Sequence, residues 1–158
     1  MPFRTISRLF AQIFKCVDEF FSFKFLIIEW QANDSYFRII GQYFGNIAIH
    51  DFLHGKDFRD ALAISDCAFV SLEKGATGLC VPSKTYSYMM QGIPLLAIMD
   101  ESDIVRDIEA GAGCWARNGE SEKLAELIRD LAANPEKVEK MRQTCRQLYL
   151  EKYTTDIC

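Results

Sequence analysis

The stretch 64–94, ISDCAFVSLEKGATGLCVPSKTYSYMMQGIP, places an apolar run, a glycine loop and a proline-started helix in succession. The apolar run 67–72 predicts a buried strand, and Gly75 and Gly78 predict the loop that follows it. In α/β proteins, ligands bind beyond the carboxyl ends of the strands. We therefore expect a ligand site in this stretch.

The helix in this stretch is expected to begin at Pro82, whose missing N–H is not needed in a first turn, and to stop at Gly92. At such a helix start the amides of Ser83, Lys84 and Thr85 are expected to be free, and the positive end of the helix dipole lies beside them. Both features suit a phosphate. The residues alone leave a second interpretation open, in which the glycines only turn the chain and Lys84 is a solvated surface lysine.

Strands and helices alternate along the rest of the chain. Short apolar runs at 25–28, 47–49, 94–99 and 114–116 predict four further strands. Regular alternation with helices predicts a Rossmann-like α/β fold, in which a parallel sheet carries helices on both faces. The remaining predicted helices follow residue 33, span 56–65 and 102–110, and form a pair that Asn134–Pro135 separates.

We expect a single domain over residues 1–158, because no repeat or linker interrupts the chain. It comprises an N-terminal helix (1–24), the sheet with its helices (25–133) and a C-terminal helix (134–158).

The composition is that of an ordinary globular protein: 49% of the 158 residues are hydrophobic, and 18 Lys and Arg oppose 22 Asp and Glu. A formal charge of −4 provides no basic surplus for phosphate backbones, which argues against a nucleic-acid partner. The six cysteines include no C-x-x-C pair and lie mostly in apolar runs, so we expect small hydrophobic packing residues and a cytoplasmic location.

The N-terminal apolar stretch 6–28 is interrupted by five charged residues, so it predicts neither a membrane span nor a signal peptide. Leu9, Ile13 and Val17 recur at helical spacing, with phenylalanines beside them, and form one broad apolar face. Packing against the core is the simpler interpretation. The alternative is a helix that docks on a partner or on the inner membrane surface, which would make the protein a peripheral membrane protein.

Three phrases resemble the nucleotide-sugar-binding half of glycosyltransferases of family 4. They are SDCAFVSL (65–72), PSKTYSYMMQGIPLLA (82–97) and DIEAGAGCWA (107–116). The resemblance runs from about Phe25 to the C-terminus and implies the C-terminal Rossmann-like domain of a GT-B fold. It implies a nucleotide-diphosphate sugar as donor substrate, no metal or other cofactor, and glycosyl transfer to a glycan or lipid-linked acceptor, as in polysaccharide biosynthesis.

The resemblance also implies which residues meet the donor: the glycine loop and the helix start face the diphosphate, and the loop beginning at His50 lies beside the base. Many family members hold the ribose with the second of two glutamates eight positions apart. This chain has Leu79 and Ser87 there, so Ser87 is expected to bind ribose more weakly. The implied diphosphate-binding residues are Gly75, Thr77, Gly78, Pro82, Ser83, Lys84 and Thr85, the implied ribose- and base-binding residues are Ser87 and His50, and no metal ligand or catalytic base is implied.

A GT-B glycosyltransferase has two Rossmann-like domains, and this sequence resembles only the second. We expect the acceptor-binding half to be missing from these residues. We also expect the usual first strand of the donor half to be missing, since nothing before Phe3 resembles it. We therefore expect the chain alone to bind a nucleoside diphosphate without transferring sugar, and to work with an acceptor-binding domain or subunit. The alternative is a non-catalytic orphan half, or one subunit of a split glycosyltransferase.

Other polar residues receive simpler interpretations. His50 and His54 are four residues apart but lack a third ligand at a recognisable spacing, which disfavours a metal site. Glu73 and Lys74 are expected to be solvated. Asp100 and Glu101 precede a predicted helix and are expected to cap it.

Overall fold

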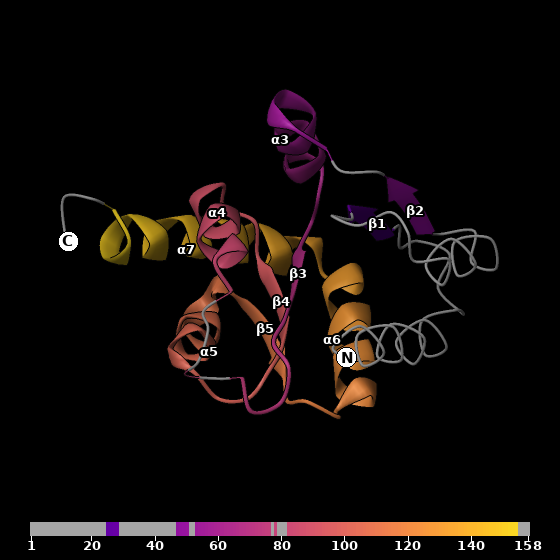
Figure 1. The fold of residues 1–158 in the computed structure, drawn as a ribbon, viewed down its shortest axis with the longest axis vertical. Helices are drawn as coiled ribbons and strands as arrows, with labels where there is room; N and C mark the ends of the chain where they lie inside the picture. The colour runs from indigo at the N-terminus through magenta and orange to yellow at the C-terminus, as the bar shows by residue number, and fades with distance from the viewer. Residues whose placement is uncertain (1–24, 29–46, 51–52, 77, 79–81, 155–158) are drawn as a thin grey trace. The chain divides into compact units, whose positions relative to one another are not determined.

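The computed structural model describes residues 25–28, 47–50, 53–76, 78 and 82–154. The chain divides into two compact units, Met1–Arg59 and Asp60–Cys158, and each is described by itself. Their described elements are coloured in Figure 1. The helices predicted for 1–24 and after residue 33 lie outside the described residues, and the single domain over 1–158 stays a prediction.

The first unit contains two parallel strands, β1 (Phe25–Ile28) and β2 (Ile47–His50), paired from Phe25 opposite Ile47 to Ile28 opposite His50. Both strands were predicted, and β2 extends one residue further, to His50. Helix α3 (Gly55–Ala63) begins in this unit and ends in the second, and its buried residues, Ala61 and Leu62, belong to the second unit.

The second unit is built on a three-stranded parallel sheet in the order β3-β4-β5. Its strands are β3 (Ala68–Ser71), β4 (Leu95–Ile98) and β5 (Gly113–Ala116), and all three were predicted. Every residue of the central strand β4 is buried, as expected for a strand that is covered on both faces. The predicted Rossmann-like α/β arrangement is therefore confirmed for this unit.

The helix after β3 is shorter than predicted. Helix α4 (Lys84–Met90) begins two residues after Pro82, with Ser83 at the N-cap. The amide of Thr85 donates to the carbonyl oxygen of Pro82 at 2.9 Å, three positions earlier, which closes a tight four-residue turn instead of the four-position pairing of an α-helix. This turn delays the start of the helix.

The remaining helices are α5 (Asp103–Asp107), the short π-helical turn η1 (Ile108–Ala112), α6 (Ser121–Ala133) and α7 (Pro135–Lys152). The helix predicted for 102–110 is thus two segments, and the second ends in a kink at Gly111, where φ is +113°. The predicted separation at Asn134–Pro135 is confirmed.

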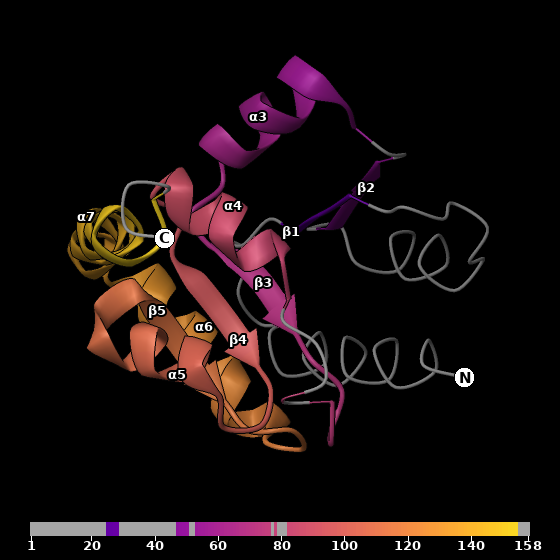
Figure 2. The same cartoon turned by 60° about the vertical axis from the view of Figure 1, so that its left-hand side comes forward.

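Helix α7 packs against α4 and η1, and Figure 2 shows it beside α4. The carboxylate of Asp107, 2% exposed, accepts hydrogen bonds from the Lys152 ammonium and the Tyr153 hydroxyl. Burial and this contact raise the pKa of Tyr153, so its hydroxyl remains a donor well into alkaline solution. Elsewhere on α7, Arg142 donates to the carbonyl oxygen of Ser65 at 2.5 Å.

Three of the cysteines, Cys67, Cys114 and Cys145, are free thiols in the described part of the chain. Burial raises the pKa of Cys67 and of Cys145 to about 12 and also raises the pKa of Cys114. At neutral pH these thiols are protonated, so they act as small packing residues, as predicted for them.

The close pairing of β4 and β5 yields a stability prediction. A Cβ added at Gly113 would lie 1.9 Å from the carbonyl oxygen of Leu95, so the strands could not keep their spacing. We expect Gly113→Ala to lower the free energy of unfolding by about 1–3 kcal/mol, the usual penalty of overpacking. Chemical denaturation measures this.

Gly119→Ala is the matched control. Gly119 has φ of +93°, but a Cβ there meets nothing within 4 Å, so this variant carries only backbone strain. If Gly113→Ala destabilises the protein no more than Gly119→Ala, the close contact with Leu95 does not limit the pairing.

Candidate functional site

The candidate site lies at the carboxyl edge of the β3-β4-β5 sheet. Because the three strands are parallel, the loops that follow Ser71, Ile98 and Ala116 leave from the same edge. The sequence predicted that the segments after Leu72 and Met99 border the site, and the topology confirms that they share an edge. The segment after Ile49 belongs to the other unit.

A carboxylate joins these loops. Asp100, just after β4, accepts a hydrogen bond from the backbone amide of Gly75 at 3.0 Å. Its other oxygen accepts from the side-chain amide of Asn118, just after β5, at 3.3 Å. Asn118 also donates to the carbonyl oxygen of Leu72 at 3.2 Å, and Leu72 directly follows β3. These contacts tie all three loops together.

The same contacts keep Asp100 ionised. The amide of Gly75, and then the side chain of Asn118, lower the pKa of the Asp100 carboxyl, and the charges of Lys74 and Arg117 act in the same direction. The prediction that Asp100 caps the next helix is therefore wrong. Ser102 occupies that N-cap position without a side-chain cap, and its hydroxyl lies 3.7 Å from the sulfur of Met99.

The glycine loop presents its backbone to solvent. Gly75 and Gly78 have φ of +80° and +84°, where only glycine is free of strain. A Cβ built at either position meets nothing within 4 Å, so another molecule can approach the backbone closely. Ala76 donates to the carbonyl oxygen of Glu73 at 3.0 Å and closes a turn. Thr77, also predicted to meet the diphosphate, lies outside the described residues.

The start of α4 differs in part from the prediction. Ser83 and Lys84 are exposed, and their amides have no partner within the described ranges. Thr85 was predicted to offer a free amide, but this amide is bonded to Pro82 and the side chain is fully buried, because Thr85 faces the core. Among the described residues, the hydroxyl oxygen of Thr85 has no hydrogen-bond partner. Ser87 is exposed on α4.

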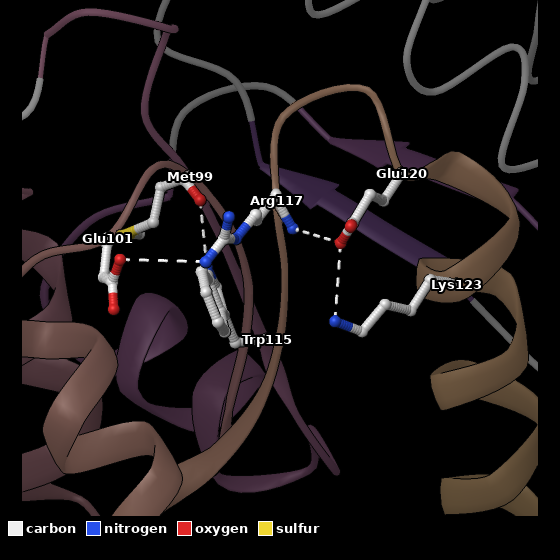
Figure 3. Close-up of polar contacts among 6 residues, drawn as sticks. All are labelled: Met99, Glu101, Trp115, Arg117, Glu120 and Lys123. Atoms are coloured by element: carbon white, nitrogen blue, oxygen red, sulfur yellow. Dashed lines mark hydrogen bonds and ion pairs between the residues drawn. The ribbon is translucent and has the colours of Figure 1, made fainter.

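A second polar cluster at this edge surrounds Trp115 (Figure 3). The indole N–H donates to the carbonyl oxygen of Met99 at 2.9 Å. Arg117 and Lys123 lie over the ring, 5.5 and 5.4 Å from its centroid. Glu120 accepts from the backbone amide of Arg117 at 2.9 Å and lies 3.4 Å from the Lys123 ammonium.

The Glu120 contacts close the loop between β5 and α6. The Arg117 amide, and then Lys123, hold the pKa of the Glu120 carboxyl below its ordinary value. Glu120, Asn118 and Trp115 were not among the predicted site residues. The available signal was position: Asn118, like Asp100, is one of the first polar residues after a buried strand.

His50 was predicted to lie beside the base. Its backbone ends β2, but its side chain is not among the parts that the structure describes, so this stays a prediction. Among the residues that the structure describes, no three His, Cys, Asp or Glu side chains gather as a metal site requires.

None of the helices described here is long and apolar enough to cross a membrane.

Comparisons with known proteins identify the fold. The crystal structure of TarM superposes with a TM-score of 0.76 over 99% of this chain at 19% sequence identity, and that of AviGT4, a glycosyltransferase involved in avilamycin A biosynthesis, with 0.54 over 92% at 16%. The chain has the fold of one Rossmann-like half of a GT-B glycosyltransferase. It covers 31% of the TarM chain and 46% of the AviGT4 chain.

A sequence comparison finds a relative that is likewise described as a glycosyltransferase. A segment of 92 residues, 57% of this chain, is 38% identical to a Pseudomonas aeruginosa protein described as "Probable glycosyltransferase WbjE", and it spans 22% of that protein's length. No family model matches the chain. A mutant of S. aureus TarM, solved in complex with fondaparinux, α-GlcNAc-glycerol and UDP, superposes with a TM-score of 0.73 at 17% identity, covering 98% of this chain and 30% of that one.

The lowered pKa of Glu120 predicts a pH-dependent contribution to stability. A carboxyl whose pKa is lower in the folded state stabilises the protein above its unfolded pKa, and this contribution is lost as pH falls through the folded pKa. Glu120→Gln should therefore lower Tm at pH 7, and the Tm difference from the unmutated protein should shrink as pH falls below about 4. Thermal denaturation between pH 7 and pH 3 measures it.

Glu126→Gln, at an exposed position on α6, is the control and should change Tm little at any pH. A Glu120→Gln difference that stays constant with pH would show that the carboxylate charge does not hold this loop.

Proposed function

We propose that this chain supplies the donor-binding part of a glycosyltransferase, which binds a nucleotide-diphosphate sugar for transfer to a glycan or lipid-linked acceptor. The observation that carries the proposal is the match of nearly the whole chain to TarM, a protein that has been solved with UDP. The local sequence similarity to WbjE supports the same class of reaction.

The carboxyl edge of the sheet offers suitable groups for such a donor. The glycine loop gives open access to its backbone at Gly75 and Gly78, and the next described segment carries Ser83 and the exposed Lys84. On this proposal the diphosphate lies against these groups. Lys84 and the backbone amides of Ser83 and Lys84 then stabilise the negative charge that develops on the leaving diphosphate, the role that a divalent ion fills in other enzymes.

The proposal is tested by isothermal titration of the 158-residue chain with UDP, GDP and ADP, with uridine and inorganic pyrophosphate as partial ligands. At least one nucleoside diphosphate should bind. Because we propose metal-independent binding, the affinity should be the same in EDTA and in Mg²⁺. If none of the three binds, the proposed function is wrong.

Lys84 provides a specific prediction. A charge-assisted hydrogen bond to phosphate contributes roughly 1.5–3 kcal/mol, so Lys84→Ala should weaken diphosphate binding by about ten- to a hundredfold. Binding of the matching nucleoside should change little. Lys56→Ala, at an exposed position on α3, is the control for the loss of one positive charge. Equal losses in the two variants would indicate a general charge effect and remove Lys84 from the site.

Ser87 provides the complementary prediction. The resembled family places a ribose-holding glutamate at this position, and Ser87 is exposed, so a longer acidic side chain fits without repacking the core. A carboxylate accepts hydrogen bonds from ribose hydroxyls more strongly than a serine hydroxyl does. Ser87→Glu should therefore tighten UDP binding in the same titration, and weaker binding by a folded variant would show that the ribose lies elsewhere.

A further inference from the structure

Asp100 is the point at which the glycine loop is attached to the sheet. One carboxylate oxygen accepts from the Gly75 amide, and the other accepts from Asn118, which itself holds Leu72 at the start of the loop. Asp100 does not cap α5, because Ser102 occupies the N-cap position. The two described contacts of the carboxylate therefore serve the loop rather than the helix.

The glycine loop needs such an attachment. Glycine loses more conformational freedom on ordering than other residues, and Gly75 and Gly78 lie in a region of positive φ that the free chain leaves readily. A loop that is ordered before the ligand arrives spares the ligand that ordering free energy. Asp100 holds Gly75 from the neighbouring strand, and the ionised state favoured by its lowered pKa strengthens this contact.

We propose that Asp100 is a positioning residue for the donor diphosphate: it holds the backbone of Gly75 in the conformation that binds the ligand. The inference rests on the proposed function, because it names how the same site is preorganised. Asp100 acts through the loop and does not itself touch the negatively charged ligand.

Glu101 is the matched control. It follows Asp100 directly, carries the same charge and is 77% exposed, and it faces Arg117 at 3.7 Å. In the described part of the chain it makes no contact with the glycine loop. Asp100→Asn and Glu101→Gln remove the same charge from adjacent positions, and only the first replaces one of the two acceptor oxygens that face Gly75 and Asn118 with an N–H donor.

The experiment is a titration of the unmutated chain and both variants with UDP and with uridine, at pH 7. If the weakened contact lowers the population of the binding conformation of the Gly75 backbone to about a tenth, the apparent Kd for UDP rises about tenfold. Glu101→Gln should stay within about twofold of the unmutated chain, since a charge this exposed interacts weakly. Uridine, which has no phosphate to meet the loop, should bind all three proteins alike.

Amide hydrogen exchange gives a readout that does not depend on ligand. The Gly75 amide should exchange more slowly in the unmutated chain than in Asp100→Asn, whereas Glu101→Gln should leave it unchanged. If Asp100→Asn does not fold, Asn118→Ala replaces it. This variant removes the Asn118 contacts with Asp100 and with the carbonyl oxygen of Leu72, so Asp100 loses one of its two described partners and should hold Gly75 less firmly. UDP binding should then weaken, and the Gly75 amide should exchange faster.

These measurements distinguish a failure of the proposed function from a failure of the inference about Asp100. If the unmutated chain binds no nucleoside diphosphate, the proposed function fails and the inference fails with it. If the chain binds UDP but Asp100→Asn binds it equally well, or if Glu101→Gln loses as much affinity, Asp100 is not a positioning residue and the proposed function still stands. Where Asp100→Asn is unfolded, an Asn118→Ala variant whose Gly75 amide exchanges faster but whose UDP affinity is unchanged also overturns the inference.

Discussion

The carboxylate of Asp100 accepts hydrogen bonds from Gly75, in the loop after β3, and from Asn118, in the loop after β5. The arrangement of the candidate site depends on this connection. Parallel pairing brings the loops after β3, β4 and β5 to one edge, but pairing alone does not fix their conformations. Asp100 and Asn118 supply that restraint with three hydrogen bonds. The glycine loop can then be open to a ligand on its outer side while it is attached to the sheet at Gly75.

Behind this edge, buried packing holds the strands themselves. Strand β4 is buried along its whole length, and Gly113 allows β5 to approach it closely. Helix α7 is fixed to the same unit through the buried Asp107, which pairs with Lys152 and Tyr153. These contacts make the sheet a rigid support, so that a few polar groups at its edge can be placed accurately.

Local sequence patterns predicted all five described strands and the break between α6 and α7, because buried strands and Asn-Pro signals are determined by nearby residues. The burial of Thr85 and the kink at Gly111 were missed, because they depend on tertiary packing. The turn at Pro82 was missed because a proline at a helix start predicts an α-helical first turn. The glycine loop was predicted from its residue types. Its attachment was not, since Gly75 and Asp100 are 25 positions apart and only strand pairing brings them together.

The central claim is that the carboxyl edge of the β3-β4-β5 sheet binds the ligand. Chemical-shift mapping of the isotope-labelled chain during titration with UDP tests it most directly, because every backbone amide reports separately. The account predicts that the largest shifts fall on Gly75, Gly78, Ser83 and Lys84, with smaller ones at Asp100 and Asn118. Shifts that instead concentrate on α6 or on the exposed face of α7, with the glycine loop unaffected, would contradict it.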